Sequence, residues 1–401
     1  MYLTKEEERM LNGEEGYAVA KAMKLIVKLG EIYGADRLIK ITSSQAAGVS
    51  YKSIGEEGLE FLRGMVEEGV KVKVPTFLNP AGMDIKNWRE FGISEKFAEK
   101  QKEIIETFKK MGVIVTCSCT PYLVGNLPHY GEHLAWSESS AISFANSVIG
   151  ARTNREGALS ALAAAITGLT PNYGLHLDEN RKPNLLVKVK TKLRADSDFG
   201  ALGYFVGKTI KNEIPYFLGI ENCSTDNLKS LGAAMAAWGS VALYHVENLT
   251  PEAKKYSENL KELEAIEFLE EDLKRCYDEV SNCMEPDLVA VGCPHASISE
   301  IEYIAKKLKG KKLNKVFWIY TSKSTKMWAD IMGYTKIIEE AGARILCDTC
   351  MVVSPLEELN FNCVGTNSGK AAKYLPSFCK KNVFFSDIDS LINMSVKYEN
   401  N

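Results

Sequence analysis

Three cysteines stand in small, turn-rich contexts that lie far apart in the chain. They are Cys119 in the segment CSCTPY, Cys293 in VGCPH and Cys350 in CDTCM. Each follows a short apolar run that is typical of a β-strand, at residues 113–115, 288–291 and 344–346. Because parallel strands carry ligand-binding loops at their carboxyl ends, the chain is predicted to fold so that these three loops meet. No local metal-binding motif has this spacing, so only a tertiary site can unite the three thiols.

Three thiolates would hold an iron–sulfur cluster with one iron atom left open, and an open iron can act as a Lewis acid on a substrate hydroxyl. The alternative is that these cysteines pack as small hydrophobic residues. The glycine, proline, threonine and histidine beside them favour a site. Cys117 and Cys347 are the nearby alternative ligands. The remaining five cysteines lack such neighbours and are interpreted as structural: Cys223, Cys276, Cys283, Cys363 and Cys379.

Composition limits the class of protein. The chain has 401 residues, of which 45% are hydrophobic and 25% charged, as expected for a soluble globular protein with a large core. Its net charge of −3 argues against nucleic acid or an anionic membrane as the main partner. The charged N-terminal segment does not resemble a signal peptide. Ten cysteines then indicate a reducing, cytoplasmic setting, where clustered thiols favour metal binding or catalysis over disulfides.

The spacing of apolar residues predicts an α/β fold in which strands and helices alternate. The expected elements are helices within residues 4–34, a strand at 37–41, a polar loop at 42–50, a strand at 70–74, a helix at about 93–111, a β-region at 183–206, and strands at 288–291, 316–320 and 344–346. A break in the helical pattern at Met284 places a soft boundary there. It separates a region 1–284, with the first cysteine and several polar loops, from a region 285–401 with the other two cysteines.

Three polar loops follow predicted strands and offer backbone amides and side-chain donors, at residues 45–50, 79–82 and 365–370. Such loops at helix N-termini bind carboxylates or phosphates, although a plain turn with a helix cap has the same composition. The last loop, GTNSGK, is the best candidate for an anion because it places Ser368 and Lys370 at the start of a helix. It lacks the spacing of a nucleotide-binding phosphate loop.

A dense polar segment lies between these loops, at residues 126–157. His129, Glu132 and His133 suggest zinc, but their spacing is not that of a zinc motif and a third ligand is missing. The segment from Ser137 to Ser140 is interpreted as a helix that opens into a site. Its polar side chains would orient a substrate or move a proton, or simply cap the helix.

Eight motifs along the chain together resemble those of aconitase X proteins. They are residues 45–50 (QAAGVS), 78–84 (LNPAGMD), 119–122 (CTPY), 131–133 (GEH), 137–140 (SESS), 150–157 (GARTNREG), 170–174 (TPNYG) and 292–295 (GCPH). The chain is similar to the large, catalytic subunit of the archaeal two-subunit type of this family. The bacterial type resembles this chain fused to a small swivelling domain, so the resemblance implies a separate small subunit as partner.

The resemblance implies an α/β, aconitase-like architecture of several βαβ domains, with mixed or parallel sheets around a central iron–sulfur cleft. Cys119, Cys293 and Cys350 would hold the cluster, of the 4Fe–4S type when complete and 3Fe–4S after iron loss. The residues expected to hold substrate groups are Gly48, Val49, Ser50, Asn79, Pro80, Ser139, Asn146 and Ser368, with Lys370 added from the predicted anion loop. The candidates for the base that accepts a proton are Ser139, Ser140 and Glu138.

The resemblance also implies a hydro-lyase that removes water from (R)-5-phosphomevalonate to give trans-anhydromevalonate 5-phosphate, in the archaeal mevalonate route to isoprenoids. A second hypothesis is dehydration of cis-3-hydroxy-L-proline or another hydroxy acid by the same chemistry. A third, of a different class, is a regulatory protein that uses its cluster as a redox or iron sensor. A fourth is a thiol-containing α/β protein without a cluster.

Overall fold

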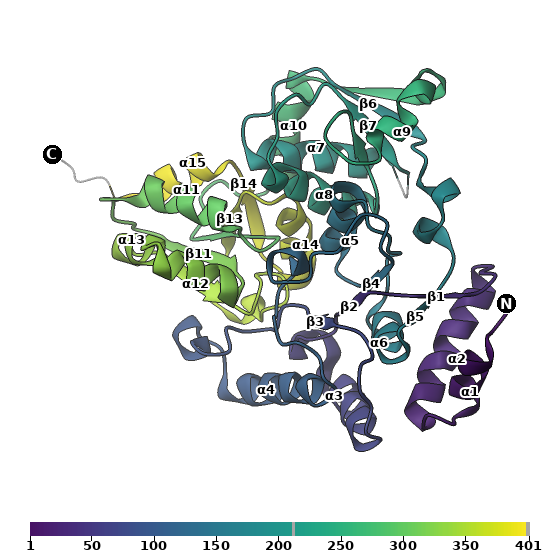
Figure 1. Ribbon diagram of the computed structural model, residues 1–401. Helices are drawn as coiled ribbons and strands as arrows, with labels where there is room; N and C mark the ends of the chain where they lie inside the picture. The colour runs from purple at the N-terminus through teal and green to yellow at the C-terminus, as the bar shows by residue number, and fades with distance from the viewer. Residues whose placement is uncertain (211–212, 398–401) are drawn as a thin grey trace.

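The computed structural model describes residues 1–210 and 213–397, and its elements form three α/β units (Figure 1). Helix α8 (Thr225–Gly239) of the second unit packs against α5 (Ser139–Phe144) of the first and α14 (Gly369–Cys379) of the third. Helix α8 therefore contacts both of the other units. No helix in the described ranges combines the length and the apolar composition needed to cross a membrane.

The first unit, at the N-terminal end, contains two small sheets. Its elements are α1 (Lys5–Asn12), α2 (Tyr17–Ile32), β1 (Leu38–Lys40), β2 (Ser43–Ala46), α3 (Tyr51–Glu67), β3 (Thr76–Leu78), α4 (Glu95–Lys110), β4 (Leu134–Trp136), α5, α6 (Ala158–Thr167) and β5 (Leu169–Pro171). One sheet is parallel in the order β3-β2-β4, and the other is an antiparallel pair of β1 and β5. A capping box between Thr4 and Glu7 begins α1, which confirms the predicted N-terminal helices.

Polar residues form β2, the central strand of the parallel sheet, where the sequence predicted a loop at 42–50. Ser44 is fully buried, and its hydroxyl lies 2.9 Å from the carbonyl oxygens of both Ala135 and Ala161. Because these partners satisfy the hydroxyl, burying it costs little, and a strand without large apolar side chains can occupy the core.

The predicted strand at 70–74 is also wrong. The N–H of Val72 donates to the carbonyl of Met111, and the N–H of Lys73 donates to that of Ala165. The segment thus bonds to two different parts of the chain and forms no ladder. Strand pairing begins only after Pro75, with β3.

The second unit is a parallel sheet in the middle of the chain. Its elements are β6 (Leu185–Val189), α7 (Asp196–Thr209), β7 (Pro215–Leu218), α8, β8 (His245–Val246), α9 (Ala253–Tyr256), β9 (Glu264–Phe268) and α10 (Glu270–Val280). The strand order is β8-β7-β6-β9. The predicted β-region at 183–206 is right for β6 and wrong for α7, which begins where the Asp198 carboxylate accepts the N–H groups of Arg194 and Ala195.

The third unit is a five-stranded parallel sheet in the order β12-β11-β10-β13-β14. Its elements are β10 (Leu288–Val291), α11 (Ile298–Leu308), β11 (Val316–Thr321), α12 (Lys323–Ile331), α13 (Tyr334–Ala341), β12 (Arg344–Cys347), β13 (Cys363–Thr366), α14, β14 (Asn382–Phe385) and α15 (Ile388–Ser395). The predicted strands at 288–291, 316–320 and 344–346 are confirmed, and so is the α/β class. Strand order reverses between β10 and β13, and ligands bind at such reversals, outside the carboxyl ends of the strands.

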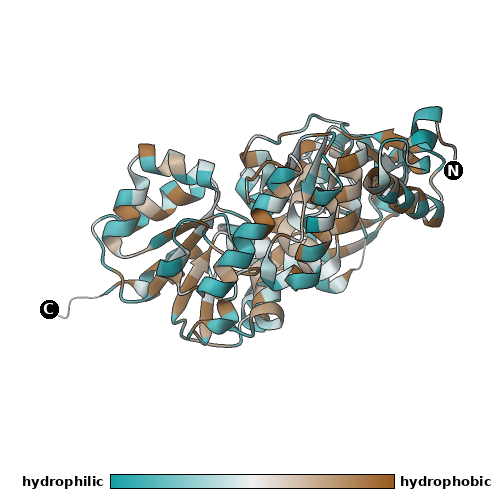
Figure 2. Cartoon of the chain, turned by 90° about the horizontal axis from the view of Figure 1, so that it is seen from below, coloured by the Kyte–Doolittle hydropathy of each residue, from teal (hydrophilic) through white to brown (hydrophobic). Residues whose placement is uncertain are grey.

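Hydrophobic residues concentrate in the interior of the molecule, while hydrophilic residues are frequent on the outer helices (Figure 2). One core belongs to the first unit and includes Met23. Another runs through both the second and third units and includes Val187, Leu288, Cys293 and Cys350. The second and third units therefore stabilise each other. The division of the chain at 284, between α10 and β10, stays a prediction.

Cys283 and Cys363 form a disulfide between the segment before β10 and the start of β13. The bond joins positions 80 residues apart whose Cα atoms lie 6.2 Å from each other. It departs from the expectation that the thiols of this chain stay reduced. The packing of β13 beside the end of the second unit brings the two cysteines together, which the sequence alone does not reveal.

We expect a Cys283→Ser/Cys363→Ser double variant to lose about 2–4 kcal/mol of unfolding free energy, because the crosslink restricts the unfolded chain. Urea unfolding of the iron-free wild type and variant, each with and without dithiothreitol, measures the effect. Reductant should bring the wild type to the stability of the variant and leave the variant unchanged. A wild type that does not respond to reductant would contradict the crosslink.

Candidate active site

A buried ion pair between Glu138 and Lys370 lies where the three cysteine loops meet. Their side chains are 14% and 9% exposed. Glu138 precedes α5 in the first unit and caps that helix by accepting the N–H of Ser140. Lys370 lies in the first turn of α14 in the third unit. The ion pair therefore joins two units that are far apart in the sequence.

Hydrogen bonds hold the carboxylate of Glu138 in its charged form. Asn79 Nδ2 donates to Oε2 at 3.0 Å, and the Ser140 hydroxyl donates to Oε1 at 3.1 Å. Burial alone would raise the pKa of Glu138, but the charge of Lys370 and these hydrogen bonds outweigh it and lower the pKa to about 2. Burial would lower the pKa of Lys370, yet the charge of Glu138 holds it above its usual range.

The thiols of Cys119, Cys293 and Cys350 are all buried, and the charges of Glu138 and Lys370 act on each of them. Burial raises the pKa of Cys293 to about 12 and also raises the pKa values of Cys119 and Cys350. The other thiols add to the rise at Cys119 and Cys293. Such thiols keep their protons unless a cation displaces them, so the set suits a positively charged metal group.

The arrangement does not suit a single metal ion. Within residues 1–210 and 213–397, no group of three or more His, Cys, Asp or Glu side chains converges as the ligands of one ion do. The three suggested zinc ligands do not converge. His129 lies 3.2 Å from Glu132, whereas the third, His133, turns to another residue: its Nδ1 lies 3.0 Å from His176 Nδ1. Thiolates of a cluster bind separate iron atoms and so lie farther apart than ligands of one ion. The three buried thiols beside Lys370 are the donor type that an iron–sulfur cluster requires.

Cys117 and Cys347, the alternative ligands, have a different environment. Both are buried, and burial raises the pKa of each thiol. The charges that act on them most strongly include those of Asp348 and Lys323, which form their own ion pair at 2.8 Å. The fold therefore separates these two thiols from the three that surround Glu138 and Lys370.

The predicted substrate segments 48–50 and 79–80 lie against the loop that carries Cys350. The hydroxyl of Ser50 donates to the carbonyl of Val353 at 2.7 Å. Just after Pro80, the N–H of Ala81 donates to the carbonyl of Asp348, also at 2.7 Å. These bonds dock the first unit on the third beside the thiols. The substrate roles of both segments stay predictions.

The predicted anion loop is bonded within the protein. The hydroxyl of Ser368 donates to the carbonyl of Cys293 and accepts the N–H of Ala371 at 3.0 Å, which caps α14. Lys370 is held by Glu138. A phosphate role for this loop stays a prediction. In the structure, the ammonium of Lys370 lies beside the three thiols.

Asn146 belongs to a second buried network, which links the first unit to the second. Its Oδ1 accepts from Arg181 Nη1 at 3.2 Å, and its Nδ2 donates to the carbonyls of Thr153 and Ala242. Arg181 forms an ion pair with Glu252, and these two side chains are 0% and 2% exposed. The amide of Asn146 is fully used in these bonds, so its substrate role also stays a prediction.

We expect Arg181→Met to lower the free energy of unfolding by about 3–5 kcal/mol, because it leaves Glu252 charged and buried without a partner. Arg152→Met is the matched control: its partner Asp178 is 57% exposed, so the loss should be below about 1 kcal/mol. Urea unfolding of the two variants and the wild type compares them. Equal losses for the two variants would contradict a structural role for the buried pair.

Gln45 is a site residue that the sequence placed in the polar loop 45–50 without a role of its own. It is fully buried in β2, and its Nε2 donates to Asn79 Oδ1 at 3.4 Å and to the Ser118 carbonyl at 3.3 Å. Its Oε1 accepts the N–H of Glu138 at 3.3 Å. Gln45 thus orients both Asn79 and Glu138. Its place in that loop and in the first of the resemblance motifs marked the segment, but not this side chain.

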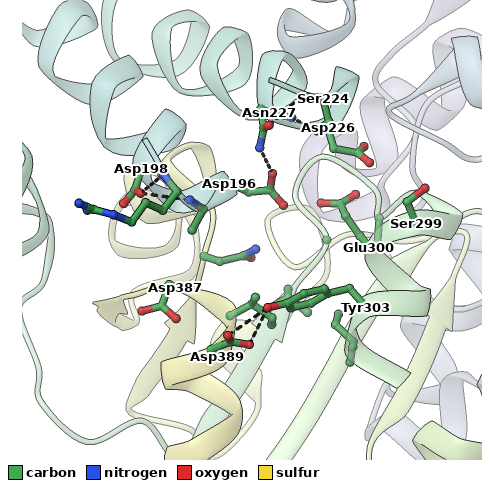
Figure 3. A pocket seen from close by; sticks show the side chains of 18 of the residues that line it. Asp196, Asp198, Ser224, Asp226, Asn227, Ser299, Glu300, Tyr303, Asp387 and Asp389 are labelled. Atoms are coloured by element: carbon green, nitrogen blue, oxygen red, sulfur yellow. Dashed lines mark hydrogen bonds between the residues drawn. The ribbon is translucent and has the colours of Figure 1, made fainter. Parts of the chain in front are cut away.

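A cavity of about 770 Å³ lies beside this site, between the second and third units (Figure 3). Gly292 and Asn367 line it at the carboxyl ends of β10 and β13. Its acidic lining residues are Asp196, Asp198, Asp226, Glu300, Asp387 and Asp389. In the described part of the chain, none of the predicted site residues lines this cavity. These six carboxylates outnumber Arg194, which also lines the cavity, so the site around Glu138 and Lys370 is the better candidate for an anionic substrate.

Comparison with known proteins agrees with this arrangement. Family models described as the first, second and third domains of aconitase X match residues 1–179, 183–278 and 286–397, which correspond to the three units. The chain is 57% identical over 400 residues to the phosphomevalonate dehydratase large subunit of Methanocaldococcus jannaschii, covering 98% of this chain and 99% of that protein.

Two further matches extend the comparison. The chain is 32% identical over 402 residues to the cis-3-hydroxy-L-proline dehydratase of Pseudomonas aeruginosa, covering 97% of this chain and 69% of that protein. The crystal structure of Thermococcus kodakaraensis aconitase X in its holo-form matches with a TM-score of 0.92 and 51% identity, covering 98% of this chain and 100% of that one. These matches confirm the resemblance seen in the sequence. The chain belongs to the aconitase X family and is a hydro-lyase.

Proposed function

We propose that this chain is the large, catalytic subunit of an iron–sulfur hydro-lyase that converts (R)-5-phosphomevalonate to trans-anhydromevalonate 5-phosphate. The observation that carries the proposal is the meeting of three buried thiols around the Glu138–Lys370 ion pair. The choice of substrate is supported by two relatives named phosphomevalonate dehydratase large subunit, at 57% and 52% identity. Their names also support a small subunit as partner.

Cys119, Cys293 and Cys350 would hold the cluster, which when bound supplies a Lewis acid for the departing hydroxyl. Lys370 places a fixed positive charge beside these thiols, and this charge favours their thiolate forms. The same ammonium would attract a substrate carboxylate. Burial strengthens both interactions because water does not screen them.

Ser140 would move the proton that must leave the substrate carbon. Its hydroxyl donates to Glu138 Oε1 and lies 3.1 Å from Lys370 Nζ, which donates to it. Ser140 would take the proton from carbon while its own proton passes to Glu138. A substrate carboxylate that draws Lys370 away would raise the pKa of Glu138 from about 2 and make it a better acceptor. Ser139, whose hydroxyl lies 3.4 Å from the same carboxylate oxygen, is the second candidate.

The competing substrate is cis-3-hydroxy-L-proline, named for relatives that are 31% and 32% identical. We would purify the chain anaerobically with its small subunit, restore iron and sulfide, and measure kcat/KM for both compounds. A clear preference for phosphomevalonate is expected. Turnover of hydroxyproline alone would keep the chemistry and overturn the substrate. Iron binding without turnover of either compound would favour a sensor.

A further inference from the structure

His295 is one buried residue that touches all three cysteine loops. Its backbone N–H donates to Cys119 Sγ at 3.2 Å. Its imidazole is fully buried and lies between two other partners: Nδ1 is 3.1 Å from Ser118 Oγ, and Nε2 is 2.8 Å from the carbonyl oxygen of Thr349. Ser118 and Thr349 directly precede Cys119 and Cys350, and His295 itself follows Cys293 by two residues.

These contacts fix the tautomer of the neutral ring. A carbonyl oxygen only accepts, so Nε2 must carry the proton that it donates to Thr349. In the neutral ring Nδ1 is then an acceptor, and the hydroxyl of Ser118 donates to it. The oxygen of Ser118 also accepts the N–H of Thr120 at 3.2 Å. Both ring nitrogens therefore form hydrogen bonds, each with a different cysteine loop.

We propose that His295 is a positioning residue that sets the spacing of the three cluster thiols. It acts through Ser118 and Thr349 and does not itself bind iron. This inference rests on the proposed function, because it concerns the group that the thiols would hold. Loss of a hydrogen-bonding partner behind metal ligands typically costs about 10–100-fold in metal affinity.

The test compares three substitutions at His295 with one at another buried histidine. His295→Ala removes both ring bonds. His295→Gln places an amide near the position of Nε2 and keeps a donor for Thr349, whereas His295→Asn places one near Nδ1 and keeps the contact with Ser118. His245→Ala is the matched control, since His245 is 1% exposed and its Nε2 lies 2.9 Å from the carbonyl of Arg181 in a different part of the fold.

Each protein is reconstituted with iron and sulfide, and iron content, visible absorption and the rate of iron loss to a chelator are measured. Unfolding of the iron-free proteins is measured alongside. We expect His295→Ala to lose iron about 10–100-fold faster than wild type, with a changed cluster spectrum. The Gln and Asn variants should each recover part of the difference. His245→Ala should lose iron at the wild-type rate even where it unfolds more easily.

Wild-type iron retention in His295→Ala would overturn the proposal. If the His295 and His245 variants lose iron equally, in proportion to their loss of stability, His295 contributes only to packing, and the proposal is overturned as well. If His295→Ala does not fold, the Gln and Asn variants carry the comparison. A wild type that binds no iron would instead defeat the proposed cofactor, which separates that failure from this one.

Discussion

A Cys293→Ser variant is expected to bind little iron and to lose dehydratase activity by about 10³-fold or more, which corresponds to at least about 4 kcal/mol of activation free energy. The reason is that a serine hydroxyl is a much weaker ligand for cluster iron than a thiolate. Among the described residues, three thiols lie around the Glu138–Lys370 pair, so we expect no neighbour to replace the missing one. Iron and sulfide content and kcat, measured anaerobically with the small subunit present, check this result.

Two kinds of control make this result specific. Cys276→Ser alters a buried thiol of the second unit and should leave the iron content unchanged. Cys117→Ser and Cys347→Ser alter the alternative ligands next to Cys119 and Cys350, and they should also keep the iron. If Cys117→Ser loses iron while Cys119→Ser keeps it, the assignment of the first ligand is wrong.

Breaking the ion pair has the second large effect. Glu138→Gln and Lys370→Met should each lower the free energy of unfolding by about 3–5 kcal/mol, because the remaining partner is charged and buried. Each should also lower kcat by about 10²–10⁴-fold, since both groups contact the hydroxyl of Ser140. Urea unfolding of the iron-free protein measures the loss of stability separately from the loss of kcat.

The double variant Glu138→Gln/Lys370→Met should be more stable than either single variant, because it leaves no unpaired charge. Lys52→Met is the control for loss of a lysine: its partner is Glu357, and the two side chains are 15% and 27% exposed. Lys52→Met should cost less than Lys370→Met. Additive losses in the double variant would show that the two charges do not depend on each other.

Local patterns were enough to predict the framework of the site. Apolar runs before Cys119, Cys293 and Cys350 indicated loops after strands, although the run before Cys119 makes only an isolated bridge to β3. The strands before Cys293 and Cys350 are where they were predicted, in β10 and β12. In the last third of the chain, apolar strand runs alternate regularly with helical patterns. The elements of the third unit were therefore the easiest to predict.

The rest depends on partners that are distant in the sequence. Lys370 was interpreted as an anion ligand because its partner Glu138 lies 232 residues away. Ser44 and Gln45 suggested a loop because the groups that satisfy their buried side chains come from other segments. His295 stood in a motif without a role, since its contacts are made only when three loops meet.

The proposed reaction of this chain, with iron bound, is the removal of water from phosphomevalonate. Proton and phosphorus NMR of (R)-5-phosphomevalonate, incubated anaerobically with the iron-loaded two-subunit enzyme, tests it most directly. We expect a new alkene proton signal with the phosphate ester intact, and no such signal with iron-free protein. An unchanged spectrum with fully iron-loaded enzyme would overturn the proposed dehydration of phosphomevalonate.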